Sequence, residues 1–170
     1  FQIRPGDAEQ VLVNPAFPAY NFDVIDGVSY RIDVSQPSKF DGDGKLVNPG
    51  ASRIVDLAYQ GRPVQPGDVF AVISNNYRAS GGGTFAGAVT ANIIYDSPDY
   101  SRDIVSAFLA QAGTVSPRAD GNWSLAPQPQ ATSIVFETSP AARDLAGARP
   151  NLAPLPDGQN GFARFRISLK

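Results

Sequence analysis

The stretch VFAVISNNYRASGGG, residues 69–83, joins an apolar run to a glycine-rich loop. Residues 69–76 are almost continuously apolar, which is typical of a central strand buried on both faces of a sheet. The loop of residues 77–87 follows this run directly. The sequence therefore predicts a buried strand that presents a glycine-rich loop at its end.

Strand-like segments flank this stretch on both sides. Residues 22–34 are rich in β-branched and aromatic types and predict one long strand or a tight hairpin, with Gly27 at a bulge or turn. The other expected strands are residues 53–60, 88–95, 132–139 and 161–169. Residues 11–13 suit a short strand or a strapped-down arm. The expected loops are residues 35–50, 61–67 and 148–158.

Two helices are indicated by their capping residues. For a helix over about 98–112, Ser97 suits the N-cap and Gly113 can end the last turn. A shorter helix is expected between Ser139, which caps it, and Gly147, which stops it. Together these elements predict an α+β fold: a single domain over residues 1–170, with a mixed β-sheet and two main helices packed on it.

The composition excludes several kinds of protein. Apolar residues make up 42% of the 170 residues, charged residues 18%, and the formal net charge is −2, which is a globular balance. No apolar run approaches the ~20 residues that cross a bilayer, and no basic face suits a nucleic acid. We therefore expect neither a membrane nor a nucleic acid polymer as a partner.

Three residue types are missing from the chain: Met, Cys and His. Without imidazole or thiol there is no Ser-His-Asp triad and no thiolate zinc site, so we expect no catalytic residue and no metal ligand in this chain. Any hydrolytic chemistry is expected on residues outside it. Because the chain has no Met, we also expect a processed chain or an excised fragment.

The candidate binding site is the loop at the end of the expected central strand. Its residues are Asn75, Asn76, Tyr77, Arg78, Ser80, Gly81, Gly82 and Gly83. The Tyr77 ring offers a flat face on which a nucleobase can stack, and the glycines let the backbone pass close to a ligand. The side-chain amides of Asn75 and Asn76 and the hydroxyl of Ser80 can form hydrogen bonds with base edges or ribose hydroxyls. Arg78 can bind a phosphate through two parallel hydrogen bonds.

Other interpretations of these residues stay open. An aromatic residue before glycines is often a hydrophobic plug beside a tight turn, and Arg78 equally suits a surface charge. The P-loop pattern is absent, and the dinucleotide-binding fingerprint fails because no convincing helix begins after the glycines. Residues 41–44, DGDG, faintly resemble a calcium loop but lack its glutamate, so we expect a solvated turn.

Seven segments carry a resemblance in a fixed order. They are YNFDVIDGVSYRID (20–33), ASRIVDLAYQGRPVQP (51–66), NNYRASGG (75–82), SPDYSR (97–102), NWSLAP (122–127), FETSP (136–140) and GFARFRISLK (161–170). They closely resemble the C-terminal domain of bacterial 2′,3′-cyclic-nucleotide 2′-phosphodiesterase/3′-nucleotidases. The match runs from about residue 14 to the end of the chain.

This resemblance implies a periplasmic hydrolase of the wider 5′-nucleotidase group, built from two domains. Two divalent metal ions would lie on an N-terminal metallophosphoesterase domain of the same polypeptide, which is absent from this chain. The present chain would bind the nucleoside part of 2′,3′-cyclic nucleotides and 3′-nucleotides, and alone it would be inactive. It would also lack the first segment of its domain.

The resemblance assigns Tyr77 to one of two aromatic rings that sandwich the base. Tyr20 is a candidate for the second ring; alternatively it is an ordinary hairpin-edge aromatic, or the second ring comes from upstream of Phe1. Gly83 stands where the 5′-nucleotidase branch has Asp, and we hypothesise that a carboxylate there would repel a 2′- or 3′-phosphate. A non-catalytic binding or adhesion module on the same scaffold is the alternative function.

Overall fold

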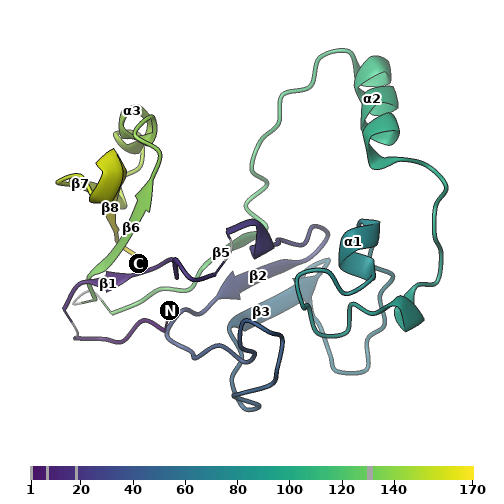
Figure 1. Cartoon of the computed structure of the whole chain (residues 1–170), viewed down its shortest axis with the longest axis horizontal. Coiled ribbons are helices and arrows are strands. Elements are labelled where there is room, and N and C mark those ends of the chain that lie inside the picture. Colours follow the sequence, from purple (N-terminus) through teal and green to yellow (C-terminus); the bar gives the residue numbers. More distant parts are fainter. Residues whose placement is uncertain (1, 7, 18, 130–131) are drawn as a thin grey trace. The chain divides into compact units, whose positions relative to one another are not determined.

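The computed structural model describes residues 2–6, 8–17, 19–129 and 132–170 (Figure 1). The backbone divides into two compact units. Unit 1 consists of Phe1–Asp41, Leu46–Val64 and Asn122–Lys170, and unit 2 of Gly42–Lys45 and Gln65–Gly121. All the described strands lie in unit 1, whereas unit 2 contains the loop of the candidate site.

The strands of unit 1 form two four-stranded sheets. The first has the order β1 (Gln10–Val11), β6 (Ile134–Thr138), β8 (Ala163–Ile167), β7 (Leu152–Leu155). The second has the order β4 (Arg62–Pro63), β3 (Ile54–Tyr59), β2 (Ser29–Ile32), β5 (Trp123–Leu125). The pairs β1–β6 and β2–β5 are parallel and the other pairs antiparallel. The α+β class with mixed strand pairing is confirmed, with the strands divided over two sheets where we expected one.

Most of the strands predicted in unit 1 are present in shortened form. β3, β6 and β8 lie inside the segments predicted as strands, and β1 favours the short strand over the strapped-down arm. Of residues 22–34 only β2 is a strand, and Gly27 lies in the turn before it with φ of 81°. β7 corrects our expectation of a loop over 148–158. It is a short edge strand containing Pro154, which an edge tolerates because one side of the strand makes no ladder bonds.

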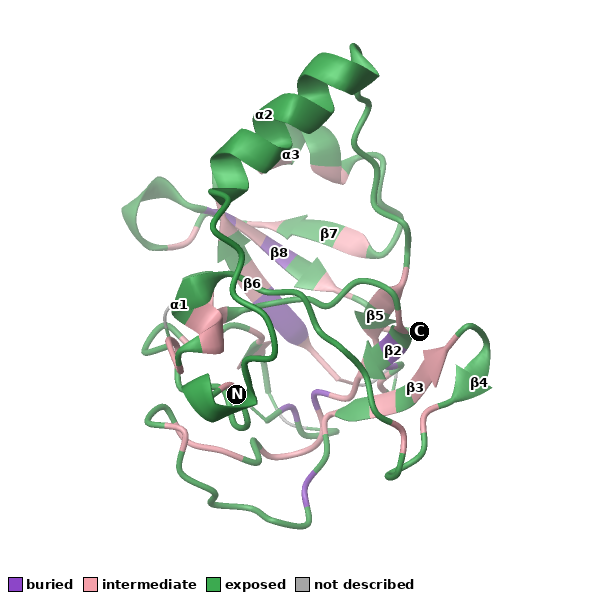
Figure 2. Ribbon diagram, turned by 90° about the vertical axis from the view of Figure 1, so that its right-hand side faces the viewer, coloured by how far each residue is buried: buried purple, intermediate pink, exposed green. Residues whose placement is uncertain are grey.

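A small apolar core holds unit 1 together. Ile3, Val34 and Ile134 form a buried cluster, and the Ile3 amide donates to the Val34 carbonyl at 2.8 Å. On β8, Phe165 is 2% exposed, and its ring centroid lies 5.8 Å from that of Phe136, its partner on β6. Figure 2 shows buried stretches on both β6 and β8. Burial of one such side chain stabilises a fold by roughly 1.5–3 kcal/mol. Through these contacts the N-terminal segment packs against Val34 and Ile134, and β8 packs against β6.

β3 contains a bulge, since its register with β2 shifts between Ser29 and Arg31. Asp56 lies at this irregularity with φ of 54°, in the left-handed region that non-glycine residues seldom adopt. The guanidinium of Arg31, on the neighbouring strand, forms an ion pair with the Asp56 carboxylate. The bulge therefore combines local backbone strain with a cross-strand charge pair.

Both predicted helices are present but begin later than expected. α2 (Ser101–Ala112) ends at Gly113, as predicted, but its N-cap is Tyr100. Ser97 instead accepts the Asp99 amide at 3.2 Å and so stabilises a turn before the helix. α3 (Ala142–Ala146) is followed by Gly147, as predicted, and contacts β7. The short 3-10 helices are η1 (Ala19–Asn21), η2 (Thr90–Asn92) and η3 (Gln159–Gly161). None of the helices in the described ranges has the length and apolarity needed to cross a membrane.

The predicted central strand is wrong. Residues 69–75 form no strand, α1 (Asn76–Ala79) begins directly after them, and Val69 and Ile73 are 93% and 99% exposed. Residues 88–95 likewise contain η2 instead of a strand. A strand needs a neighbour that takes up its backbone hydrogen bonds, and none of the described strands pairs with these segments. The apolar pattern indicated a tendency to form a strand but no partner for it.

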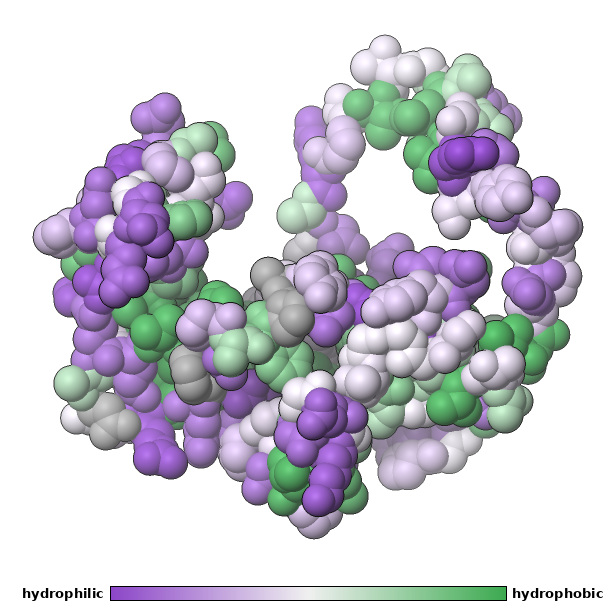
Figure 3. Space-filling view, viewed as in Figure 1, coloured by the Kyte–Doolittle hydropathy of each residue, from purple (hydrophilic) through white to green (hydrophobic). Residues whose placement is uncertain are grey.

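The apolar stripe of α2 is also solvent-accessible. Figure 3 shows hydrophobic side chains along this helix, and between 46% and 56% of each is exposed: Ile104, Val105, Phe108 and Leu109. The sequence correctly predicted the helical period of these residues. It did not predict that these side chains are about half exposed.

Candidate functional site

The candidate loop of unit 2 is organised around α1, a single helical turn. Asn75 is the N-cap of α1, and its side-chain Oδ1 accepts the Arg78 amide at 2.9 Å. The Oδ1 of Asn76 accepts the Tyr77 amide at 2.9 Å. Both side-chain oxygens therefore bond to the backbone of the loop itself. In this arrangement the two asparagines shape the turn that presents Tyr77.

The Tyr77 side chain is 60% exposed and lies against Gly82. The Gly82 amide donates to the Tyr77 carbonyl at 2.8 Å. A Cβ atom at position 82 would lie 2.6 Å from both Cε1 and Cζ of the ring, so a side chain there would displace the ring. The bare backbone of Gly82 is thus the support on which the ring is placed.

The backbone around the glycines reverses direction through positive φ angles. Gly81 and Gly83 have φ of 95° and 82°, a region open to glycine at little cost. Thr84 follows with φ of 59°, which is a genuine outlier for a β-branched residue. Ser80 ends α1, and its amide donates to the Asn76 carbonyl at 3.0 Å. Nothing in the order of residues indicated the strain at Thr84, because only the backbone angles show it.

Arg78 is half-buried and bonded within the loop. Its guanidinium donates to the Gly82 carbonyl at 3.1 Å and lies 5.4 Å from the centroid of the Tyr77 ring. It lies 4.9 Å from the centroid of Phe85, a residue that the sequence did not single out. Such cation–π contacts contribute roughly 0.5–1 kcal/mol at exposed sites. The Arg78 guanidinium thus contacts both the Tyr77 and the Phe85 rings. Its contact with a phosphate stays a prediction.

Tyr20, the candidate for a second stacking ring, lies in η1 of unit 1 and is 75% exposed. Tyr77 belongs to unit 2. The pairing of these two rings on one base therefore stays a prediction.

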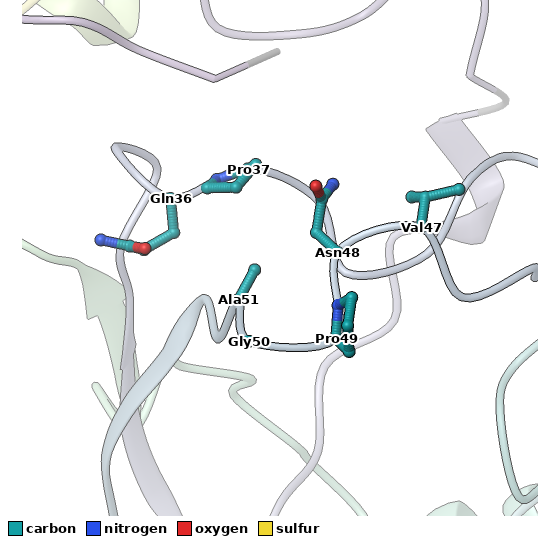
Figure 4. Close-up of a pocket in the computed structure, with 7 residues that line it drawn as sticks. All are labelled: Gln36, Pro37, Val47, Asn48, Pro49, Gly50 and Ala51. Atoms are coloured by element: carbon teal, nitrogen blue, oxygen red, sulfur yellow. The ribbon is translucent and has the colours of Figure 1, made fainter.

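Two cavities of unit 1 contain none of the predicted site residues. The first, of about 400 Å³, is lined by Gln36, Pro37 and residues 47–51 (Figure 4). The Asn48 side chain is bonded to the protein itself, since its Nδ2 donates to the Ser38 carbonyl at 2.6 Å. The second, of about 500 Å³, is lined by the end of β5, residues 150–151 and residues 167–170. Neither presents an exposed aromatic face like that of Tyr77.

A polar cluster beside the first cavity organises the loop after β2. The Asp33 carboxylate accepts the Ser35 amide at 2.9 Å, the Ser35 hydroxyl at 2.6 Å and the Gln128 amide nitrogen at 3.3 Å. Burial raises the pKa of Asp33, but the hydrogen bonds from Ser35, Gln128 and Gln36 outweigh it, so the pKa lies below its usual value. Burial lowers the pKa of the nearby Arg53, against the opposing effect of the Asp33 charge. The cluster is structural.

Comparison with known families decides the relationship of the chain. Residues 7–90 match the family described as "5'-nucleotidase, C-terminal domain". This range includes Tyr77 and all three glycines of the loop. The chain belongs to the 5′-nucleotidase C-terminal domain family, through residues 7–90.

Curated relatives of this 5′-nucleotidase C-terminal domain extend the similarity over almost the whole chain. The "2',3'-cyclic-nucleotide 2'-phosphodiesterase/3'-nucleotidase" of Salmonella typhimurium is 48% identical over 172 residues, which are 94% of this chain and 26% of the relative. The protein of the same name from Haemophilus influenzae is 41% identical over 180 residues, 99% of this chain and 27% of the relative. The "Trifunctional nucleotide phosphoesterase protein YfkN" of Bacillus subtilis is 39% identical over 170 residues, 99% of this chain and 12% of the relative. The chain thus spans between 12% and 27% of these three relatives. No solved structure matches it.

The described residues of the 5′-nucleotidase C-terminal domain do not fit a metal centre. Within the described ranges, no group of three or more His, Cys, Asp or Glu side chains is placed to hold a metal ion. The resemblance implies the two divalent ions on an N-terminal domain outside this chain, and this expectation stays a prediction.

Proposed function

We propose that this chain binds the nucleoside part of the substrate in a periplasmic, metal-dependent 2′,3′-cyclic-nucleotide 2′-phosphodiesterase/3′-nucleotidase. The names of the Salmonella and Haemophilus relatives support the activity, and the family match supports the assignment of the domain. The proposed ligands are 2′,3′-cyclic nucleotides and 3′-nucleotides.

One observation carries the binding role: the Tyr77 ring is exposed while its position is fixed by the Gly82 backbone. A ring that is already held in place loses little conformational freedom when a base stacks on it. Stacking of one base on an aromatic side chain contributes about 1–3 kcal/mol and tolerates any base. The loop therefore suits a nucleobase platform better than it suits a plug, whose ring would be turned inward.

The rest of the proposed enzyme supplies the chemistry. We place two divalent metal ions on an N-terminal metallophosphoesterase domain of the same polypeptide, where such ions activate water and neutralise phosphate oxygens. The present chain contributes affinity and orientation through Tyr77, and alone it does not hydrolyse nucleotides.

Titration of the isotopically labelled chain with adenosine and 3′-AMP tests the binding role. Binding to the unmodified chain is followed by NMR through the signals of the Tyr77 ring, and the affinities of the variants are measured by calorimetric titration. Tyr77→Ala is expected to weaken both affinities by about five- to 150-fold, which corresponds to the loss of one stacked base, whereas Tyr77→Phe keeps the aromatic face and most of the affinity.

Tyr95→Ala is the matched control, because Tyr95 lies in the same unit and is 75% exposed. It should leave both affinities unchanged. If neither ligand perturbs the Tyr77 signals at millimolar concentration, or if Tyr95→Ala weakens binding as much as Tyr77→Ala does, the binding role is refuted.

A second experiment tests the enzymatic context and the location. The gene region upstream of this chain is sequenced, and the full polypeptide is assayed with 2′,3′-cyclic AMP beside the present chain. We expect an export signal, a set of metal ligands and turnover that a chelator abolishes in the full polypeptide, with no turnover by the present chain. Degraded metal ligands would favour a non-catalytic binding or adhesion module.

A further inference from the structure

The turn Gly42–Lys45 packs against the glycine-rich loop within unit 2. A Cβ atom on Gly44 would lie 2.7 Å from the Thr84 carbonyl oxygen and 2.9 Å from the Thr84 Cβ. The φ of Gly44 is 77°, which also favours glycine. The Thr84 hydroxyl donates to the Gly83 carbonyl at 2.7 Å, and the Gly42 carbonyl oxygen lies 3.5 Å from the same hydroxyl. The close approach of Gly44 to Thr84 thus places the turn beside the loop.

Thr84 links this turn to the stacking ring. It is two residues from Gly82, which supports Tyr77, so the backbone between them spans at most about 7 Å. Its φ of 59° is costly for a β-branched side chain and persists only where surrounding contacts impose it. The turn therefore lies within the reach of a single nucleotide whose base is stacked on Tyr77.

The turn carries a basic side chain that suits a ligand phosphate. Unit 2 contains four basic residues: Lys45, Arg78, Arg102 and Arg118. Of these, Lys45 is the one that lies on the turn beside Thr84. Lys45 follows Gly44 directly and is exposed. An ammonium group on a flexible stem binds phosphate as a point charge and needs no fixed bidentate geometry.

We propose that Gly42–Lys45 is a second wall of the nucleotide site, in which Lys45 binds a phosphate of the nucleotide whose base lies on Tyr77. This inference rests on the proposed function. Gly44 is a positioning residue that keeps the wall against Thr84. The exposed carboxylate of Asp43, on the same turn, opposes the phosphate and limits the gain. The wall makes the site prefer a nucleotide over the corresponding nucleoside.

The test compares the dissociation constants of adenosine and 3′-AMP for the whole chain. The unmodified chain should bind 3′-AMP more tightly than adenosine. Lys45→Gln should weaken 3′-AMP binding by about two- to fivefold, the range of one exposed ion pair, and leave adenosine binding unchanged. Asp43→Asn should strengthen 3′-AMP binding alone. Lys39→Gln, an equal charge change at an exposed residue of unit 1, should alter neither affinity.

Salt and backbone variants separate the charge from its position. Raising the ionic strength from about 0.01 M to about 1 M should weaken 3′-AMP binding more in the unmodified chain than in Lys45→Gln. Gly44→Ala should remove the preference for 3′-AMP although both charges remain. Gly67→Ala is the control, since a Cβ there meets no atom within 4 Å.

The outcomes distinguish this inference from the proposed function. If adenosine binds but 3′-AMP binds no more tightly, or if Lys45→Gln changes both affinities by the same factor, the second wall is wrong and the base platform stands. If neither ligand binds, both proposals are wrong.

Discussion

Gly82 and the Tyr77 ring are so close that no side chain fits between them: a Cβ on Gly82 would lie 2.6 Å from the ring atoms Cε1 and Cζ. Gly82→Ala should therefore push the ring out of its position. The affinity for adenosine should fall by as much as the loss of one stacked base allows, about five- to 150-fold. Calorimetric titration measures the change. Gly67→Ala should be neutral, and an equal affinity in both variants would refute the role of Gly82.

Gly83 has φ of 82°, and the same backbone cost applies to Asp and Asn there. Gly83→Asp and Gly83→Asn therefore differ in charge but hardly in shape or strain. We expect 3′-AMP to bind about two- to fivefold more weakly to the Asp variant than to the Asn variant, because the carboxylate repels the phosphate. Adenosine should bind both variants equally. Identical 3′-AMP affinities would remove the hypothesis that glycine at this position protects a 3′-phosphate.

Asp56 adopts φ of 54° in the bulge of β3, where glycine would be unstrained. Its ion pair with Arg31 opposes this cost, but both side chains are about half exposed, so the pair contributes only about 0–1 kcal/mol. In an Arg31→Gln background, Asp56→Gly should stabilise the chain by about 1 kcal/mol. Urea unfolding measures this change. A destabilised double variant would show that the bulge depends on the Asp56 side chain in some other way.

Asp33 should make the stability of unit 1 depend on pH. Its pKa is lower in the folded chain than in the unfolded chain, so the unfolded state binds the proton more readily. The stabilisation by ionised Asp33 is present above the unfolded pKa of about 3.9 and is lost as pH falls through the lower, folded pKa. The difference in unfolding free energy between the natural chain and Asp33→Asn should therefore shrink between pH 6 and pH 3. A pH-independent difference would contradict the hydrogen-bond network.

The sequence predicted unit 1 well where local patterns and turn chemistry agree. The alternation in β8 reflects one buried face, with Ala163 and Phe165 inside, and such a face is visible in the residue order. Gly113 and Gly147 mark helix ends because the chain must leave the helix at a residue that tolerates unusual angles or offers little helix propensity. The helix starts were predicted less well, because α2 and α3 begin after Tyr100 and Ala141, whose side chains make no capping hydrogen bond.

Contacts between distant residues could not be predicted in the same way. The run at 69–76 has the composition of a buried strand, but composition carries no information about which segment pairs with it. In the site, the sequence singled out NNYRASGGG, of which residues 76–79 form α1, and the binding role of the exposed Tyr77 stays a prediction. The contact of Gly44 with Thr84 joins residues far apart in the chain, and no periodic pattern indicates it.

The uncovered run after Asp68 also bears on how the purified chain behaves in solution. Residues 69–74, VFAVIS, have no charge and no proline and favour extended conformations, and Val69 and Ile73 are almost wholly accessible to water. Short segments of this kind stack into cross-β fibrils when copies meet. In concentrated solutions of the chain, thioflavin T fluorescence should therefore rise with time as fibrils form. Ile73→Lys should delay this rise.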